Sequence, residues 1–233
     1  MKRHSSGFII GIAVAIILGF GVIAGTALSL RSVAGLGFEP GVLRASKTGA
    51  NSATLSVSTF PDSHVCHATE GEPQIDWVTY CPSTSFEVPA NSIITLVISN
   101  YDSSSDLAND YYGQVQGTIG GVELVNNQPM SQVDATNIAH TFTLQSIPES
   151  PNQLFVSVPL VGVADNAPTP VVIAGNSYPK PNIISFQFRT GPPGTYIWHC
   201  YDPCGSDRGE PYNFSGAMST TGYMAGTLTV ANY

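Results

Sequence analysis

Charged residues are scarce in this chain: only 10% of its 233 residues are Asp, Glu, Lys or Arg, whereas about 25% is typical of globular domains. Basic residues are the rarer kind, with 8 Lys and Arg against 16 Asp and Glu. Lys2, Arg3 and Arg31 lie in or beside the N-terminal segment, which leaves 5 basic and 16 acidic residues and a net charge near −11 for the remainder. Such a surface repels nucleic acid, and it can steer a basic partner such as a cytochrome-like domain.

Several enzyme motifs are also absent. The chain has no Gly-rich phosphate loop, no Gly-x-Ser-x-Gly nucleophile turn and no His-Glu-x-x-His metal motif. The sequence therefore gives no support for the catalytic mechanisms that depend on these motifs. Neither helical periodicity nor an internal repeat is visible after the N-terminal segment. Gly (23) and Pro (17) are abundant instead, together with Ser, Thr and Asn, a composition typical of strands and turns. Residues 183–189 alternate cleanly, with Ile184, Phe186 and Phe188 on one face of a predicted strand. We therefore expect an all-β domain.

One long apolar segment lies at the N-terminus. Residues 8–30 form an uninterrupted run of 23 apolar or small residues, and a helix that spans a bilayer needs about 20. A basic stretch at residues 2–4 precedes the run, so the N-terminus is expected to stay in the cytoplasm. A cleaved signal has a shorter apolar region of about 7–15 residues, although Gly-Thr-Ala at 25–27 offers a cleavage pattern. We predict a retained transmembrane helix in residues 1–31, with a cleaved signal as the alternative; either places the rest outside the cytoplasm.

The chain has four cysteines, an even number that suggests disulfide bonds in an oxidising compartment. Cys66 and Cys81 bracket one polar segment and are predicted to pair. Cys200 and Cys204 either pair as well or bind a metal, and the sequence leaves both interpretations open.

The first part of the exported chain contains few pattern signals. Residues 32–52 contain Gly, Pro and Ser without clear periodicity and are predicted to be a tether, so that the domain spans residues 53–233. Residues 53–60 alternate and are rich in β-formers, which predicts the first strand. His64 and His67 lie in the loop that follows. They are candidate metal ligands, and exposed loop histidines without metal are the alternative.

The most informative pattern is Gly-Thr-Tyr-Ile-Trp-His-Cys-Tyr-Asp-Pro-Cys at residues 194–204, followed after a loop by Gly-Tyr-Met-Ala-Gly-Thr-Leu-Thr-Val at 222–230. Both stretches read as strands, and they carry a thiol at Cys200 and a thioether at Met224. Two such sulfur donors held between strands form a soft site that selects copper. Because side chains alternate along a strand, His199 is expected to point away from any site that contains Cys200.

Two further stretches belong with this one. Residues 86–100 read as a short strand, a Pro-Ala-Asn-Ser turn and a β-branched strand. Residues 138–144, Ile-Ala-His-Thr-Phe-Thr-Leu, open another strand with His140 near its start. Between them lies an insertion at 101–137 that is rich in Asp, Ser, Gly and Asn and contains one predicted β-ribbon, at 121–125. An insertion of this length hints at a surface for a partner.

These stretches resemble the cupredoxins, the blue-copper electron carriers. In that family a Gly-Thr-Tyr strand delivers the ligand Cys, a Met-x-Gly strand leaves the site, and the first ligand His heads a strand as His140 does here. The resemblance implies a cupredoxin-like Greek-key β-sandwich and a copper ion bound by His140, Cys200 and Met224. The family also has a ligand His shortly after the Cys, and this chain has no His after Cys200.

The resemblance therefore does not identify the fourth copper ligand. The spacing Cys200-x-x-x-Cys204 is similar to that of the binuclear copper domain of cytochrome oxidase subunit II, which also has an N-terminal membrane anchor, but the His of that motif is replaced here by Arg208. Cys204 is a candidate second thiolate in a mononuclear site, and Met218 is another soft donor in the same loop. A Cys200–Cys204 disulfide in a metal-free sandwich is the alternative.

The resemblance implies a membrane-anchored copper protein outside the cytoplasm that transfers single electrons and transforms no substrate. Its partner would be a redox protein such as a cytochrome or a terminal oxidase. Two alternatives remain: a domain that binds or delivers copper for an oxidase, and a metal-free, disulfide-stapled module with a structural or interaction role.

Overall fold

The computed structural model describes residues 41–66, 77–105, 107, 109–202 and 216–233. No helix in this part of the chain is long and apolar enough to cross a membrane. The predicted transmembrane helix of residues 1–31 lies outside the described residues, as do His67 and Cys204. Those expectations therefore stay predictions.

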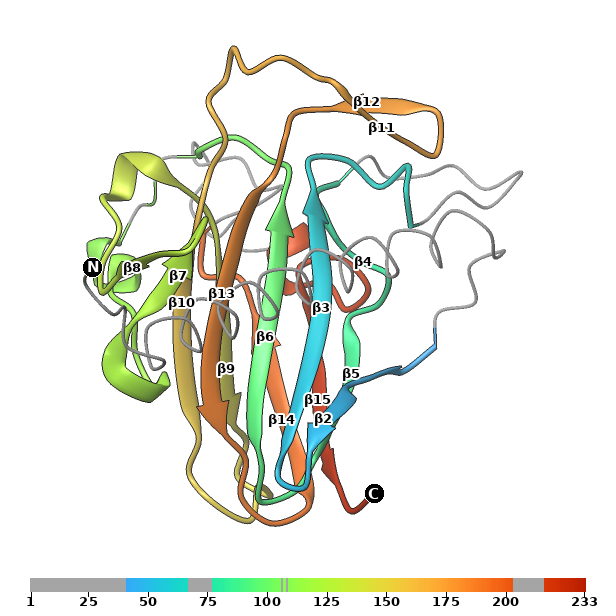
Figure 1. Cartoon of the computed structure of the whole chain (residues 1–233), viewed down its shortest axis with the longest axis vertical. Helices are drawn as coiled ribbons and strands as arrows, with labels where there is room; N and C mark the ends of the chain where they lie inside the picture. Colours follow the sequence, from blue (N-terminus) through green and yellow to red (C-terminus); the bar gives the residue numbers. More distant parts are fainter. Residues whose placement is uncertain (1–40, 67–76, 106, 108, 203–215) are drawn as a thin grey trace, which may run out of the picture. The chain divides into compact units, whose positions relative to one another are not determined.

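Two β-sheets form the described domain (Figure 1). The first contains, from edge to edge, β1 (Leu43–Arg44), β5 (Ser85–Pro89), β15 (Ala225–Ala231), β14 (Gly194–His199), β9 (Ile138–Ser146) and β10 (Phe155–Val161). The second contains β2 (Ser46–Gly49), β3 (Ser52–Phe60), β6 (Ile93–Asn100), β13 (Asn182–Arg189), β7 (Glu123–Val125) and β8 (Gln128–Met130), with β4 (Thr79–Cys81) also paired to β3. A separate hairpin consists of β11 (Val171–Ile173) and β12 (Asn176–Tyr178).

Helical structure in the described residues is limited to four short 3-10 turns: η1 (Asp110–Gly113), η2 (Ile119–Gly121), η3 (Ala135–Asn137) and η4 (Ala217–Ser219). The prediction of an all-β fold is thus confirmed. The reason is visible in the composition, since turn formers and β-branched residues dominate and no stretch of the domain has a helical period.

One hydrophobic core lies between the two sheets. In β13 the alternating residues Ile184, Phe186 and Phe188 are buried, while the residues between them are more exposed. They belong to the same buried cluster as Trp198 of the opposite sheet, whose indole N–H donates a hydrogen bond to the Thr84 carbonyl oxygen at 3.0 Å. Burying one large apolar side chain stabilises a fold by about 1.5–3 kcal/mol. The alternation read from the sequence therefore identifies the inner face of each sheet, and the predicted sandwich is confirmed.

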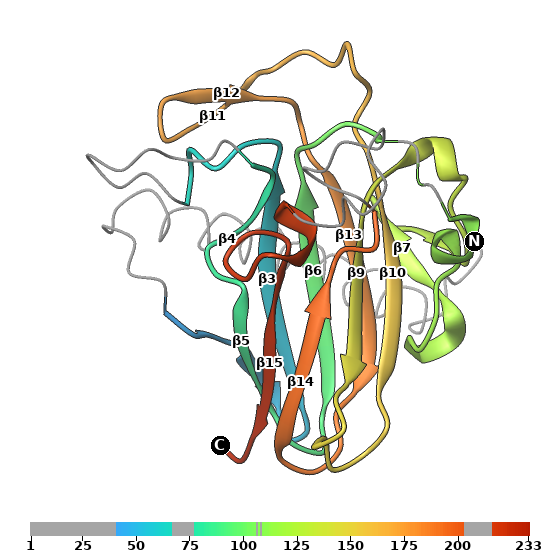
Figure 2. The ribbon, with the colours of Figure 1, turned by 180° about the vertical axis from the view of Figure 1, so that it is seen from behind.

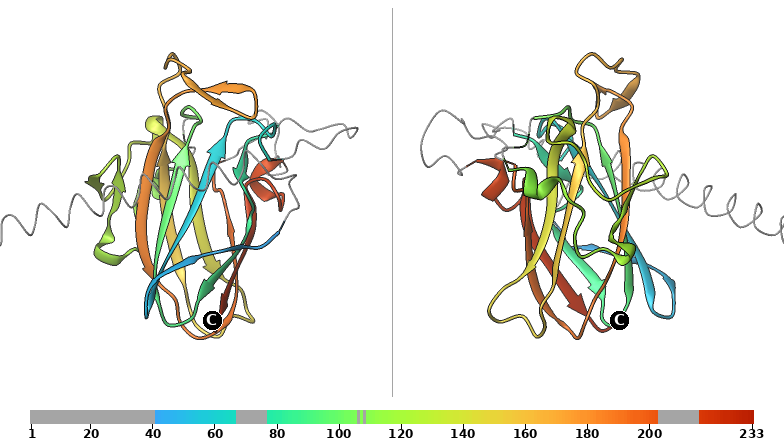
Figure 3. Two further views of the ribbon diagram at one scale, coloured as in Figure 1. Left: turned by 45° about the vertical axis from the view of Figure 1, so that its right-hand side comes forward. Right: turned by 90° about the vertical axis from the view of Figure 1, so that its left-hand side faces the viewer.

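The strand directions gather several chain segments at one end of the sandwich. Figure 2 shows β6 and β14 ending where β9 and β15 begin. The register agrees, because His199 at the end of β14 is paired with both Thr143 of β9 and Ala225 of β15. The β11–β12 hairpin lies at this same end and extends beyond the strands (Figure 3). Cys200 follows β14 directly, so it comes close to the start of β9 and to the residues before β15.

The domain begins earlier than expected. β1 pairs in parallel with β5, and β2 pairs with β3. Between them Ala45 is buried, and its N–H donates a hydrogen bond to the Glu87 carbonyl at 2.8 Å. The tether predicted for residues 32–52 is therefore wrong for residues 43–49. These edge strands gave no signal because every residue of β2 is exposed, which removes the alternation on which a strand prediction depends.

The insertion at residues 101–137 adds two strands to the second sheet. The predicted β-ribbon is confirmed as the β7–β8 hairpin, and β7 pairs with β13. Asn126 and Asn127 connect the two strands with φ angles of 50° and 68°. A two-residue hairpin turn of type I′ needs positive φ at both positions, and Asn tolerates that conformation better than most residues. The hairpin fixes this part of the insertion to the sandwich.

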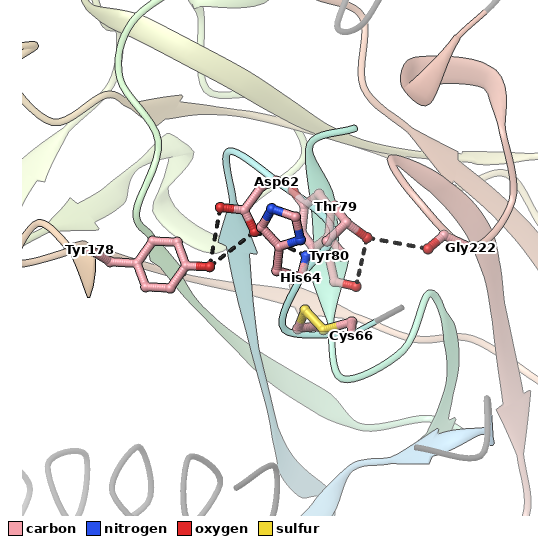
Figure 4. Close-up of a disulfide and its surroundings, with 8 residues drawn as sticks. Asp62, His64, Cys66, Thr79, Tyr80, Tyr178 and Gly222 are labelled. Carbon is pink, nitrogen blue, oxygen red and sulfur yellow. Dashed lines mark hydrogen bonds between the residues drawn. A yellow bond between two sulfur atoms is a disulfide. The ribbon is translucent and has the colours of Figure 1, made fainter. Parts of the chain in front are cut away.

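The predicted disulfide is confirmed. Cys66 and Cys81 are bonded, with their Cα atoms 5.8 Å apart, and the bond ties the loop after β3 to β4 (Figure 4). In the same region the Tyr178 hydroxyl donates to the Asp62 carboxylate at 2.9 Å, and the His64 backbone N–H donates to Asp62 at 3.0 Å. The disulfide thus fixes the loop to β4, and the hydrogen bond from Tyr178 links the same loop to the β11–β12 hairpin.

Replacing both Cys66 and Cys81 with Ala should lower the free energy of unfolding. The two residues are 15 apart in sequence, and a loop of about that length is stabilised by roughly 3 kcal/mol when it is closed by a disulfide. Urea unfolding of the double variant and of the wild type, both without reductant, measures the difference. Peptide mapping of the wild type is the control, and equal unfolding midpoints for cross-linked wild type and variant would contradict the prediction.

Candidate metal site

His140 is the first element of the site. It is the third residue of β9, and only 2% of it is exposed. Its Nε2 atom lies 3.0 Å from Oδ2 of Asp102, and Asp102 is held in place just beyond β6 by reciprocal hydrogen bonds with Asn100. Because Nε2 faces a carboxylate, Nδ1 is the ring nitrogen that remains for a metal. Carboxylates occupy this position beside many metal-binding histidines, where they fix the tautomer and the ring orientation.

Cys200 is the second element, and it is fully buried. Its sulfur accepts a hydrogen bond from the Thr141 backbone N–H at 3.4 Å, and its own N–H donates to the Met224 carbonyl at 2.9 Å. Thr141 is the residue after His140, so the thiol lies against the strand that carries the imidazole. The thiolate is the form of cysteine that binds metals.

The site has the electrostatics of a cation-binding centre. Burial alone would lower the pKa of His140, but hydrogen bonds and charge interactions with Asp102 and Cys200 outweigh burial and raise that pKa to about 10. Without a metal, the imidazole is therefore favoured in its protonated form beside the Asp102 carboxylate. A metal ligand must be neutral imidazole, so an incoming metal displaces the proton and supplies positive charge in its place. The donors and the charge both fit a soft metal ion.

The thioethers form the third part of the site. Met224 is fully buried, and its N–H donates to the Ala217 carbonyl at 3.1 Å, which joins the start of β15 to η4. Met218 in η4 is 5% exposed. Both methionines belong to the same buried cluster as Cys200. The fold therefore gathers His140, Cys200 and Met224 at one end of the sandwich, with Met218 in the adjoining turn.

The remaining candidates lie elsewhere or are outside the described residues. His199 points to the other face of β14, as predicted, where its Nε2 lies 3.4 Å from the side-chain nitrogen of Gln145. His64 lies in the disulfide loop. Cys204 falls in the undescribed segment 203–215. Within the described ranges no group of three or more His, Cys, Asp and Glu residues could hold a metal ion, and the methionine thioethers are a separate class of donor.

Sequence reasoning missed three residues of the site. Asp102 orients His140, and Thr141 donates to the thiol. Asp202, 1% exposed, accepts a hydrogen bond from the Ser105 hydroxyl and so links the chain after Cys200 to the insertion. The contact between Asp102 and His140 joins residues that are far apart in the sequence. The other contacts depend on pairing between distant strands.

Comparisons of the sequence give no relative: no family model matches the chain, and no curated protein matches it. Comparison of the structure does find similar proteins. Auracyanin B is 18% identical over 84% of this chain and 99% of its own length, with a TM-score of 0.32. The copper protein rusticyanin is 13% identical over 79% of this chain and 86% of its own, with a TM-score of 0.29.

A multicopper oxidase from Campylobacter jejuni is 11% identical over 84% of this chain, with a TM-score of 0.38, and the chain covers 29% of that protein. Auracyanin and rusticyanin are cupredoxins, the family that the sequence motifs resemble. The likeness is one of fold, and at these scores no residue role or activity is transferred from them. The β-sandwich of this chain is established by its own strand pairing.

Proposed function

We propose that this chain is a copper-binding carrier of single electrons, anchored in a membrane with its β-sandwich outside the cytoplasm. His140, Cys200 and Met224 would hold the copper ion, and Cys204 is the candidate for a fourth ligand. The observation that carries the proposal is the buried pair of His140 and Cys200, one imidazole and one thiol supplied by neighbouring strands. Imidazole, thiolate and a weak thioether are the donors of electron-transfer copper sites.

Side-chain and backbone groups of the chain orient the candidate ligands. Asp102 accepts from Nε2 of His140 and thereby directs Nδ1 inward, and the Thr141 N–H stabilises the Cys200 sulfur. The buried rings of Tyr196 and Trp198 keep water out of the same face of β14. When bound, copper alternates between its +1 and +2 states and so takes up or releases one electron. A rigid, dry frame suits that role because little has to rearrange when the charge changes.

Copper titration of the reduced protein tests the proposal. We expect one copper ion per chain and an intense visible absorption from thiolate-to-copper charge transfer. A second copper ion per chain would favour the binuclear arrangement. If no copper binds while Cys200 is disulfide-bonded to Cys204 in native protein, the carrier function fails. The metal-free interaction module, which the Cys66–Cys81 staple favours, would then be the better account.

Asp102→Asn should weaken copper binding by about 10- to 100-fold, the usual cost of removing a partner that orients a metal ligand. The amide keeps the size of the side chain, but it removes the negative charge that stabilises and aligns His140. Competition with a copper chelator of known affinity gives the dissociation constants. Asp134→Asn, which alters an exposed carboxylate that caps η3, is the matched control and should leave copper affinity unchanged.

The membrane anchor has its own test. We expect the full-length chain to be recovered only with detergent and a chain that starts at residue 38 to be recovered without it, because residues 8–30 are the only run of such apolar length in the sequence. Protease is then added to cells whose cytoplasmic membrane is exposed but still closed. It should cleave the sandwich domain. Recovery of the full-length chain in the soluble fraction would contradict retention of the anchor.

A further inference from the structure

Three tyrosine rings form a continuous series next to the candidate copper site. Tyr201 directly follows Cys200 in the chain. The ring of Tyr112, from η1 in the insertion, stacks on the ring of Tyr201 with centroids 4.4 Å apart and planes inclined by 5°. Tyr111 meets Tyr112 edge-on at 5.3 Å, and half of Tyr111 is exposed. The series therefore runs from the residue that follows a buried thiol to the protein surface.

Two hydrogen bonds to β9 determine where the inner ring, that of Tyr201, lies. The Tyr201 N–H donates to the Thr141 hydroxyl at 2.7 Å, and the Tyr201 hydroxyl donates to the Gln145 side-chain oxygen at 3.2 Å. Thr141 and Gln145 both belong to β9, the strand that carries His140. Tyr201 is thus attached to the same rigid strand as the candidate ligand.

Hydrogen bonds also hold η1, which carries the two outer rings of Tyr111 and Tyr112. Asn109 caps η1 by accepting from the Tyr111 N–H at 3.1 Å, and the Tyr111 hydroxyl donates to Gln116 at 2.8 Å. Gly113 ends the turn, and its carbonyl accepts from the Val133 N–H at 2.8 Å. A side chain at Gly113 would come within 2.7 Å of the Val133 carbonyl oxygen. The turn therefore needs glycine there to bring the two tyrosines against Tyr201.

We propose that Tyr201, Tyr112 and Tyr111 form the path by which electrons pass between the copper site and a partner protein. This inference rests on the function proposed above. Electronic coupling decays more slowly through covalent bonds and stacked π-systems than across gaps, so the series couples a buried metal to the surface. One electron leaves the reduced site and is accepted by the oxidised partner. No bond forms or breaks, and no proton is transferred, because the rings serve as a coupling medium.

The charge around the outer end indicates the kind of partner. Residues 101–137 contain neither Lys nor Arg, and the exposed Asp110 stands directly before Tyr111. A redox protein with basic residues around its electron-accepting edge is complementary to this surface. Such complementarity mainly raises the association rate, and added salt weakens it.

Stopped-flow reduction of the full-length, copper-loaded, oxidised protein by hexaammineruthenium(II) tests the path, with one electron passing from the ruthenium complex to the copper site. Tyr112→Leu removes the stacked ring and should slow reduction about tenfold, equivalent to about 1.4 kcal/mol of activation free energy. Tyr112→Phe keeps the ring and should retain the wild-type rate. Tyr233→Leu, a change at the C-terminal tyrosine that contacts Arg44, is the control and should also retain it.

The absorption band separates this inference from the proposed function. If Tyr112→Leu keeps the band and the rate, the path is wrong and the copper site stands. If the wild type shows no band, the proposed function fails and the path fails with it. A slow Tyr112→Phe variant with an intact band would also overturn the path, because it would assign the effect to the hydroxyl and therefore to proton movement.

The docking surface has a readout that needs no copper. Adding redox-inert hexaamminecobalt(III) to the metal-free protein should shift the NMR signals of Asp110 and Tyr111, and Asp110→Asn should reduce those shifts. The same variant should lessen the salt dependence of reduction by the ruthenium complex. Shifts confined to other acidic residues, such as Glu149, would overturn the assignment of this surface to the partner.

Discussion

Cys200→Ser is expected to abolish the thiolate-to-copper absorption, because a hydroxyl is a hard and weakly acidic donor that cannot replace a soft thiolate. Serine keeps nearly the same volume, and the Thr141 N–H can still donate to its oxygen, so the sandwich should remain folded. His140→Ala should weaken copper binding by more than about 100-fold, since removing only a partner of a ligand costs about 10- to 100-fold. Absorption spectra and chelator competition measure both effects.

The other donors should behave differently. Met224→Leu is expected to keep the copper ion and its colour while changing the reduction potential, because a weak axial thioether tunes the metal more than it holds it. Cys204→Ser decides the fourth ligand. Loss of copper would make Cys204 a ligand, whereas an unchanged band would direct the search to Met218 or His64. Asp134→Asn, which alters the exposed cap of η3, is the control.

One finding would contradict the predictions for all four ligand substitutions. If mass spectrometry shows a Cys200–Cys204 disulfide in native, functional protein, no thiolate is available and all four substitutions should leave function unchanged.

Glu123→Gln should make the protein's stability much less dependent on pH. Glu123 lies at the start of β7 with no exposed surface, and neither carboxylate oxygen has a hydrogen-bond partner among the described residues. Burial raises its pKa from 4.5 to about 8. The folded protein therefore keeps the proton over a pH range in which the unfolded chain has already lost it.

The sign of the effect follows from this difference. The contribution of Glu123 to stability is complete below pH 4.5, declines as the pH rises and is lost above about pH 8. At roughly 1.4 kcal/mol per pKa unit, the loss amounts to about 5 kcal/mol across that window as an order of magnitude. Urea unfolding at a series of pH values gives the slope, from which the Gln variant should lose the part due to Glu123 and keep the part above pH 6.5 due to the raised pKa of His140. Its absolute stability is a separate matter, because an unpartnered buried amide also has a cost.

A matched substitution supplies the control. Glu149 is exposed, so Glu149→Gln should keep the wild-type slope. If the wild-type slope between about pH 5 and 6.5 is absent, or if Glu123→Gln retains it, then the carboxylate finds a partner in solution that neutralises the cost of burial.

Local patterns were sufficient to locate most strands. In β13 and β14 the inward residues alternate with outward ones, and the buried positions Phe186 and Trp198 are those that the pattern selects. The Asn-Asn turn of the β7–β8 hairpin could also be read directly. The pattern failed at β1 and β2, because edge strands that are mostly exposed have no inner face to record in the sequence.

Local sequence signals were also sufficient to identify the candidate ligands. A His at the head of a strand and a Cys at the end of another are local signals, and the chemistry of imidazole, thiolate and thioether restricts the metal. The sequence by itself therefore determined the all-β class, the pairing of Cys66 with Cys81 and the identity of His140, Cys200 and Met224 as candidates.

Only the tertiary structure decided the surroundings of these groups. The contact between Asp102 and His140, the stacking of Tyr112 on Tyr201 and the burial of Glu123 without a partner all join the insertion to the sandwich. None of them follows from the spacing of residues along the chain. They depend on strand register and on how a long insertion closes over the sheets, and these are set by the packing of the whole core rather than by any one segment.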